Sequence, residues 1–525
     1  MSSPLHIPAP GAVAWTRGNL GEALPGLCTP LSWTFFGPAT EDGIRGGFHL
    51  IGALSAAEVP IPAEVGERFV TPIHGWPTAN IDMMARMAER LPGVDPAQIE
   101  KELFGEVRDI PRHPTKRRYP AVAAKMPVAV ATCLRRVRAS RAAAEAWWRC
   151  ALTAPLTEAD AQRVLREARP LFVQNMLLHT VISMLASGVY EKVDLLARAA
   201  GPPHSAPQLV TGYGSVEETR VAADLWALSR GELSLETVLD RHGWHGINNG
   251  QLHVTVWREE PEHVRALAAR FRELPDEQSP DRLGERQRTL RQQAEAALLA
   301  DLPRRSRPPA RLTLTMAQKF VAHREVGKAG YLIAVDGARL AARTLGEIWA
   351  KDGHLVDPED VVFLTLAEVQ AGPQPPWADL VVERRELDRI YRQQSLPMAW
   401  VGVPEPVTEV AVDDGSELSG LGVSPGVVEG IARVVIDPHE DDLRPGEILV
   451  CATTDPSWVS LFLAAAAVVI DIGGQLSHGA IVARELGIPC VVNTRNGSRR
   501  IRSGDALRIN GTTGEVSILV PQETS

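Results

Sequence analysis

The chain has 525 residues, of which 45% are hydrophobic and 23% are charged, as is ordinary for a globular protein of about three domains. Its formal net charge of −9 argues against general nucleic-acid binding, which usually requires a basic surface. Five widely spaced cysteines, no visible signal peptide, and a longest apolar run (residues 461–470) shorter than a membrane span of about 20 residues predict a cytoplasmic protein without membrane contact.

The first 75 residues are punctuated by proline and glycine. Composition predicts that they form an extended arm with little regular structure. They also contain the string G-N-L-G-E-A-L-P-G-L-C-T-P-L-S-W, which includes Asn19, Glu22, Thr29 and Trp33. Packing of this arm against the helices that follow is the simplest role for these four side chains.

A helical pattern extends from about residue 80 to residue 395, because apolar residues recur at the period of an α-helix. It predicts a mainly α-helical domain over residues 1–400. The predicted helices cover residues 128–152, 157–187 with a break near Pro170, 216–229, 262–274, 280–300 and 312–351. The basic, proline-interrupted residues 303–311 are expected to form a solvated connection.

Residues 401–418 lack helical periodicity and contain two prolines and five acidic residues, which predicts a mobile linker. Glycine-bounded β-type runs with one or two helices follow over residues 419–520. This part of the chain is expected to fold as a compact C-terminal α/β domain of the β/β/α type. The chain shows no internal repeat and no low-complexity tract.

The most informative stretch is residues 473–492, within a predicted strand–turn–helix–strand unit. An apolar run over residues 464–470 leads into a glycine pair, and a polar turn presents Ser477 and His478 before a helix that ends at Gly487. A helix N-terminus attracts anions, and a neutral imidazole is a nucleophile near pH 7. His478 could therefore carry a phosphoryl group, the alternative being a capping or core histidine.

The string G-G-x-x-S-H-x-A-I-V-A-R-E-x-G-I-P over residues 473–489 resembles the phosphohistidine swivelling domain of the phosphoenolpyruvate-utilising enzymes, which include rifampicin phosphotransferases and phosphoenolpyruvate synthase. The likeness extends to residues 422–435, 453–458 and 505–516. It implies that His478 accepts and donates the phosphoryl group. The residues expected to hold the phosphoryl oxygens are Gly473, Gly474, Ser477 and Gly479.

Arg324 and Lys328 are four residues apart and share one face of a predicted helix. An anion between them would remove their mutual repulsion. The segment resembles an R-E-x-x-[KR] helix of the rifampicin phosphotransferases. The resemblance implies that Arg324 contacts the transferring phosphoryl oxygens and that Lys328 is a second clamp or helps to activate the acceptor. A surface salt-bridge face is the alternative.

The resemblance also implies that the α-helical domain over residues 1–400 is the substrate domain. It implies a set of substrate-binding residues as well, although two of the motifs depart from the family pattern. These departures, at residues 75–80 and 242–252, indicate an altered acceptor site. The residues expected at this site are Asn19, Trp33, Asn80, His242 and His245. Turn and packing roles are the alternative for both histidines. They could also bind a metal ion, but no third ligand is spaced with them, so no metal site is predicted.

The string Gly422-Val423-Ser424-Pro425-Gly426 matches the G-x-S-x-G pattern of serine hydrolases. That motif requires a strand, a turn and then a helix, whereas β-branched residues follow Ser424. A serine hydrolase is therefore rejected. The chain also lacks a P-loop motif.

The ATP-grasp domain that precedes this architecture in the family is not found in the sequence. We therefore expect ATP, with its Mg²⁺, on a separate nucleotide-binding subunit. His478 would pass the phosphoryl group to a small-molecule hydroxyl, with or without later dehydration of the product. A non-catalytic binding or scaffold protein with the same fold is the second hypothesis. A third is that a small donor such as phosphoenolpyruvate charges the histidine through another protein.

Overall fold

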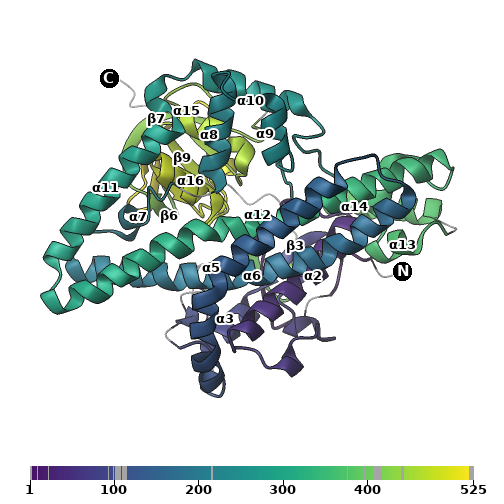
Figure 1. Ribbon diagram of the computed structural model, residues 1–525, viewed down its shortest axis with the longest axis horizontal. Coiled ribbons are helices and arrows are strands. Elements are labelled where there is room, and N and C mark those ends of the chain that lie inside the picture. The colour runs from purple at the N-terminus through teal and green to yellow at the C-terminus, as the bar shows by residue number, and fades with distance from the viewer. Residues whose placement is uncertain are drawn as a thin grey trace. The chain divides into compact units, whose positions relative to one another are not determined.

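The computed structural model describes residues 3–8, 10–21, 23–92, 94–97, 100, 108, 115–214, 217–374, 377–394, 396–405, 417–438 and 443–519. The chain forms two compact units (Figure 1). Unit 1 comprises Met1–Met184, Asn248–Val254 and Val326–Thr408. Unit 2 comprises Leu185–Ile247, Thr255–Glu325 and Glu409–Ser525. Two long helices, α6 (Glu158–Ala200) and α12 (Arg307–Lys351), contribute residues to both.

Unit 1 is mainly helical. Besides its parts of α6 and α12, it contains α1 (Gly18–Gly21), α2 (Pro30–Leu50), α3 (Ile81–Glu89), α5 (Tyr119–Ala151), α13 (Leu366–Ala371) and α14 (Trp377–Arg392). A small antiparallel sheet has the order β2-β3-β1-β4. Its strands are β1 (Ala14–Thr16), β2 (Val70–Ile73), β3 (Trp76–Asn80) and β4 (Ala399–Val401), so the sheet joins the start of the chain to residues near 400.

Helix α2 contradicts the predicted extended arm. Thr29 caps the helix by accepting a hydrogen bond from the Ser32 N–H, and Pro30 occupies the first helical position. Gly46 and Gly47 lie three and four residues after Gly43, so each is next to Gly43 on the helix surface. A Cβ at Gly43 would stand 2.5 Å from Met176 Cγ, and one at Gly47 would stand 2.9 Å from Thr180 Cβ. The glycines that suggested an arm therefore allow close packing of α2 on α6.

The predicted break near Pro170 is also wrong, because α6 continues through this proline from residue 158 to residue 200. Packing supports the helix around it, since Phe172 contacts Phe35, Phe36 and Tyr331 with ring centroids 4.9–5.8 Å apart. The stabilisation from these three buried aromatic contacts offsets the loss of the backbone hydrogen bond that proline cannot form. The predicted connection at residues 303–311 is likewise mostly helical, because α12 begins at Arg307.

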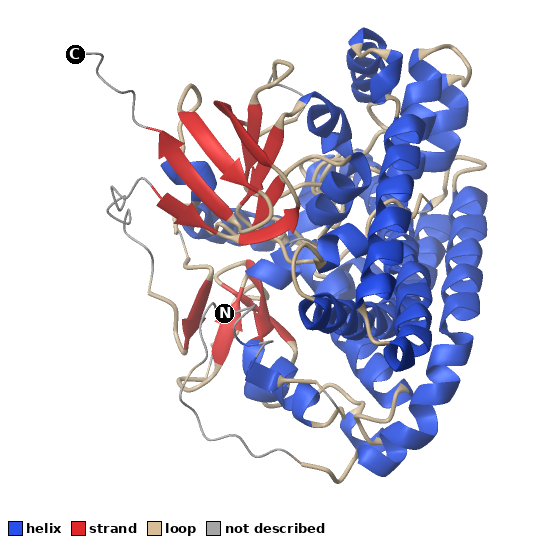
Figure 2. Cartoon of the chain, turned by 90° about the vertical axis from the view of Figure 1, so that its left-hand side faces the viewer, coloured by secondary structure: helices blue, strands red, loops and turns tan. Residues whose placement is uncertain are grey.

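Unit 2 combines helices with an eight-stranded sheet of order β5-β12-β11-β7-β8-β9-β10-β6, drawn with the smaller sheet in red in Figure 2. Strands β7, β8, β9 and β10 pair in parallel, and the outer pairs are antiparallel. The strands are β5 (Glu417–Ser419), β6 (Leu421–Ser424), β7 (Val427–Val434), β8 (Ile448–Cys451), β9 (Ala467–Ile470), β10 (Cys490–Val492), β11 (Ala506–Asn510) and β12 (Glu515–Leu519).

Besides its parts of α6 and α12, unit 2 contains eight described helices; those over residues 217–229, 261–273, 280–301 and 478–486 agree with the predicted ranges to within a few residues, and the other four were not predicted. The eight helices are α7 (Ala206–Leu209), α8 (Glu217–Ser229), α9 (Leu235–His242), α10 (Pro261–Glu273), α11 (Pro280–Asp301), α15 (Val459–Ala464), α16 (His478–Leu486) and α17 (Gly497–Arg500). One hydrophobic core joins α8, α9 and α10 to the sheet, since it contains Leu225, Val238 and Phe271 together with Val468 of β9. The predicted fold class, a mainly helical region followed by a C-terminal α/β domain, is confirmed.

The compact units divide the chain differently from the predicted domains. Unit 2 contains the predicted C-terminal domain together with helices from residues 185–325, which the prediction assigned to the substrate domain. Most of the predicted linker, residues 406–416, lies outside the described residues. The linker therefore stays a prediction, as do the boundaries at residues 400 and 419.

Among the described residues, α6 has the length and apolar composition of a membrane-spanning helix. A core helix of a globular protein meets the same criteria, and several apolar side chains of α6 are fully buried, including Phe172, Val181 and Ile182. Length and composition alone are weak support for a membrane span, and the buried side chains give α6 a packing role.

Candidate functional site

His478 occupies the first position of α16, nine residues long and preceded by the strand β9. Ser477 is extended (φ −64°, ψ 162°) and its Oγ accepts a hydrogen bond from the Ala480 N–H, so it is the N-cap. The helix starts two residues earlier than predicted because this cap lies before His478. At the other end, Gly487 is left-handed (φ 72°) and ends the helix, as predicted.

Two of the three glycines predicted to bind phosphate are required by close contacts. A Cβ on Gly479 would stand 2.3 Å from Ile470 Cδ1 and 3.0 Å from Thr454 Oγ1, so only glycine lets α16 begin this close to the end of β9. A Cβ on Gly473 would stand 2.9 Å from Ser477 Oγ. Gly474 faces open space, with nothing within 4 Å of an added Cβ.

The loop before His478, residues 473–477, is held by side chains from three helices. Arg324 of α12 donates a hydrogen bond from Nη1 to the Leu476 carbonyl oxygen and forms an ion pair with buried Glu325. Tyr190 of α6 donates its hydroxyl hydrogen to Gln475 Oε1 at 2.8 Å. Arg484 of α16 donates to the Gln475 carbonyl oxygen at 2.7 Å. These contacts hold two main-chain carbonyl groups and one side chain of the loop in place.

A buried carboxyl supports the end of β9, immediately before the loop. Asp471 accepts hydrogen bonds from Thr494 Oγ1 at 2.9 Å, from the Ser498 N–H at 3.0 Å and from Ser498 Oγ. Burial raises the pKa of Asp471 above its usual value, and the hydrogen bonds from Ser498 and Thr494 oppose that rise. The network ties the β9 end to the segment after β10, so both sides of the loop are anchored.

The C-terminal half of α16 is anchored by a second buried network. Thr211 Oγ1 donates to the Arg484 carbonyl at 2.5 Å. Glu485 accepts from the N–H groups of Tyr213 and Gly214 at 3.1 and 3.2 Å. Burial lowers the pKa of Arg484 and raises that of Glu485, because both charged groups are shielded from water on this face of the helix. The helix that begins with His478 is therefore anchored at Arg484 and at Glu485, its two charged residues.

The side chain of His478 is only 3% exposed. It lies against the loop and the helix N-terminus, where the N–H groups of the first turn have no acceptor within the helix itself. A ring this buried cannot contact a bulky molecule unless the residues that cover it move.

The predicted cationic pair is divided between the two units. Arg324 belongs to unit 2 and contacts the loop two residues before His478. Lys328 lies one turn further along α12 and belongs to unit 1. The prediction of one helix face is confirmed, whereas a role for Lys328 at the phosphoryl group stays a prediction.

Asn80 and Trp33, two of the predicted substrate residues of unit 1, have structural roles. Asn80 caps α3 by accepting from the Met83 N–H, and its amide donates to the Gly66 carbonyl, both at 3.0 Å. Trp33 is buried in α2. Asn19 lies in α1, but its side chain lies outside the part of the chain that the structure describes, as does residue Glu22. Acceptor binding by these residues stays a prediction.

His242 and His245 lie together in unit 2, each 1% exposed, with ring centroids 5.9 Å apart. The ring of His245 contacts the rings of Trp244 and Trp257, with centroid distances of 3.7 and 5.3 Å. The sequence offered no third ligand, but the structure brings Glu217 from the start of α8 to within 4.8 Å of both histidines, measured between potential ligand atoms. Glu217 is 25 residues before His242 in the chain, and no spacing motif links them.

The serine of the G-x-S-x-G string is structural. Ser424 ends β6, and the next element is strand β7, so the helix that a nucleophile elbow requires does not follow. Its Oγ donates to the Ala483 carbonyl of α16 at 3.4 Å. The rejection of a serine hydrolase is consistent with this position.

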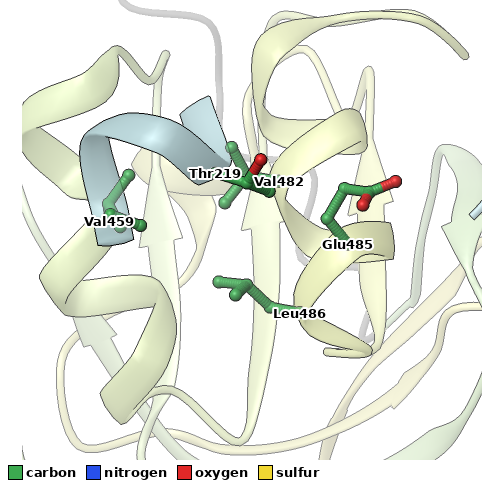
Figure 3. A pocket seen from close by; sticks show the side chains of 6 residues that line it. Thr219, Val459, Val482, Glu485 and Leu486 are labelled. Carbon is green, nitrogen blue, oxygen red and sulfur yellow. The ribbon is translucent and has the colours of Figure 1, made fainter. Parts of the chain in front are cut away.

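A small cavity lies between α8, α15 and α16 (Figure 3). The side chains of Val459, Val482 and Leu486 line it together with Thr219, Ala222 and Glu485. Its volume is about 10 Å³, which is about the space needed by one water molecule. It is therefore a packing defect and is too small to hold an acceptor molecule.

Two family models match parts of unit 2. Residues 443–514 match the mobile domain of PEP-utilising enzymes, and residues 232–325 match the fourth domain of rifampicin phosphotransferases. The first match contains His478 and the second contains Arg324. The resemblance predicted from residues 473–489 is therefore confirmed.

Three relatives are rifampicin phosphotransferases. The chain is 32% identical to that of Streptomyces sviceus over 331 residues, which cover 60% of this chain and 38% of the relative. A Streptomyces sp. relative is 33% identical over 303 residues, covering 54% and 34%. That of Bacillus subtilis is 31% identical over 210 residues, covering 39% and 24%. The chain thus spans less than two fifths of the length of these relatives. A solved structure of an Enzyme I protein matches with a TM-score of 0.18 and 16% identity, covering 59% of this chain and 83% of that one.

Proposed function

We propose that this chain, which carries a mobile domain of the PEP-utilising type, is a phosphotransferase component in which His478 carries a phosphoryl group to a small-molecule hydroxyl. The observation that carries the proposal is the position of His478. It is the first residue of a capped helix, next to a loop that an arginine from α12 holds. A phosphoryl group on this imidazole would meet N–H donors and the positive end of a helix dipole.

Arg324 supports the same function. Phosphoryl transfer depends mainly on positioning and on cations that stabilise charge on the equatorial oxygens. The guanidinium already contacts the Leu476 carbonyl, two residues before His478, which makes it a candidate to bind oxygens carried by His478. Glu325 would then hold the guanidinium in place by its ion pair. We assign Lys328 a second contact on the acceptor side.

The donor is proposed to be ATP with Mg²⁺ on a separate nucleotide-binding subunit. Burial of His478 fits a two-station scheme, because one arrangement would shield the phosphoryl group from water and another would expose the ring to the donor. Loss of phosphate from the product, giving a dehydrated compound, would be a later step of the same proposal.

A pulse–chase experiment tests the function. The chain is incubated with ATP labelled at both the β- and the γ-phosphate, with and without a candidate nucleotide-binding partner, and the label is assayed for acid lability. We expect acid-labile label that disappears when the acceptor is added, because phosphohistidine would be an intermediate. Replacing ATP by phosphoenolpyruvate tests the other donor in the same assay.

His478→Asn should remove the label, and His263→Gln, which changes a partly exposed histidine of α10, should keep it. Label that persists in His478→Asn would contradict the proposal. A folded wild-type chain that acquires no label with any donor or partner would leave the non-catalytic binding function instead.

A further inference from the structure

We propose that Glu217, His242 and His245 form a binding site for one divalent transition-metal ion of the Zn²⁺ class. The three residues come from the start of α8, the end of α9 and the turn after α9. One potential ligand atom of each lies within 4.8 Å of the others, and all three side chains are buried, Glu217 at 5% exposure. The proposal concerns metal binding alone and does not depend on phosphoryl transfer.

Asp224 on α8 prepares His242 to act as a ligand. The Nε2 of His242 lies 2.8 Å from Asp224 Oδ2, and a carboxylate accepts, so Nε2 carries the hydrogen. Nδ1 then presents its lone pair. Nδ1 is buried and has no hydrogen-bond partner among the described residues. A carboxylate that fixes the tautomer of a histidine in this way is the usual outer contact of a metal-binding imidazole.

The ligand chemistry selects the class of ion. Two imidazoles and a carboxylate suit Zn²⁺ and its neighbours in the first transition row, whereas Mg²⁺ and Ca²⁺ prefer oxygen ligands. Ligands about 2.0–2.2 Å from a tetrahedral ion stand roughly 3.3–3.6 Å apart, so the side chains would close by on the order of 1 Å. Three protein ligands leave a fourth position for water or another group.

The surroundings fit a fixed site. Trp244 and Trp257 contact the ring of His245 and limit its rotation. Val221, Leu225 and Val238, from the same two helices, belong to the main core of unit 2. A metal ion here would tie the first turn of α8 to the turn after α9.

The test uses the full chain without a histidine tag, so that no added histidine binds metal. The protein is stripped with a chelator and titrated with Co²⁺, whose visible absorption reports coordination by nitrogen and oxygen, and then with Zn²⁺ in competition. We expect one ion per chain. We also expect binding to weaken as the pH falls, since the imidazoles must be neutral to bind.

Matched variants locate the ion. Glu217→Gln and His245→Gln keep side-chain size and should lower affinity at least about 10-fold, and Asp224→Asn should lower it about 10- to 100-fold through His242. His263→Gln is the control and should bind as the wild type does. The proposal is overturned if the folded wild type shows no Co²⁺ absorption, or if Glu217→Gln and His245→Gln bind the ion unchanged.

Discussion

The guanidinium of Arg324 donates a hydrogen bond to the carbonyl oxygen of Leu476, two residues before His478. A residue from a long helix thereby contacts the loop that precedes His478, although 152 positions separate Arg324 from Leu476 in sequence. The contact makes Arg324 a support of the loop in this arrangement, and the proposed function also gives it a contact with a phosphoryl group on His478. The two roles can be separated by experiment.

Arg324→Ala should slow transfer from His478 to the acceptor more than it slows charging of His478. Removal of a preorganised donor to developing charge typically costs about 10²–10³ in rate. Arg324→Lys should restore part of the rate, because it keeps the charge but loses the planar fork. Rapid quenching of labelled protein after mixing with acceptor measures the transfer step.

The control for this prediction is Arg311→Ala, which removes an exposed arginine from the same helix and should leave both steps unchanged. Equal loss of charging and transfer in Arg324→Ala would mean that the arginine only holds the loop. No loss in either step would remove Arg324 from the transfer site.

Gly479→Ala should destabilise unit 2 by about 1–3 kcal/mol, because its Cβ would stand 2.3 Å from Ile470 Cδ1 and would overpack the start of α16. Gly474→Ala is the matched variant, since its Cβ meets nothing within 4 Å, and should stay within about 0.5 kcal/mol of the wild type. Urea denaturation followed by far-UV circular dichroism compares them. Equal midpoints for the two variants would disprove the close approach of Gly479 to β9.

Tyr190→Phe should loosen the loop before His478 by removing the hydrogen bond to Gln475. Loss of one such bond costs about 0.5–1.5 kcal/mol, so the ring of His478 should be exposed more often. The rate at which diethyl pyrocarbonate modifies His478, read by peptide mass spectrometry, should rise. Gln475→Ala should have the same effect, and the double variant should add little to either. Fully additive effects would show that the two side chains act separately.

Unit 1 should lose stability as the pH falls from 6.5 towards 4 because of His253. Burial, with help from Arg392 and Arg339, lowers the pKa of His253 from 6.5 to about 4, while Asp388 opposes the shift. The unfolded chain takes up a proton below pH 6.5 and the folded chain does so only near pH 4, so acid favours unfolding in this window.

In urea denaturation across this range, His253→Gln should show a shallower fall in stability than the wild type, and His263→Gln should match the wild type. A His253→Gln variant with an unchanged slope would contradict the assignment of this pH dependence to His253.

The prediction from sequence agrees best with the structure in the segment around His478, where the residues proposed for the chemistry also determine the local fold. The strand, capped turn, helix and αL glycine of residues 467–487 follow from local residue choice, and each was predictable. Composition misled at α2, because glycines that commonly mark loops here allow α2 to pack closely on Met176 and Thr180. The pairing of helices, which decides this, is a tertiary property with no local signal.

The residues of the candidate sites likewise fall into those that a local motif identifies and those that only tertiary packing brings together. His478 and its neighbours lie in one short segment, so pattern and position pointed to them. The packing of α8 beside α9 brings Glu217 close to His242 and His245. Tyr190 likewise contacts Gln475 although it lies 285 residues earlier in the chain. No spacing motif predicts contacts between residues so far apart in sequence. The sequence therefore indicated the two histidines as potential ligands but not Glu217 as the third.

The central claim is that the imidazole of His478 forms a bond to phosphorus, and peptide mapping tests it most directly. The wild-type chain is charged with its donor, digested under alkaline conditions that preserve phosphohistidine, and analysed by mass spectrometry with electron-transfer fragmentation. The account predicts one phosphoryl group on His478 in the wild type and none in His478→Asn. A phosphoryl group found on another residue of a turnover-competent chain, with His478 unmodified, would contradict it.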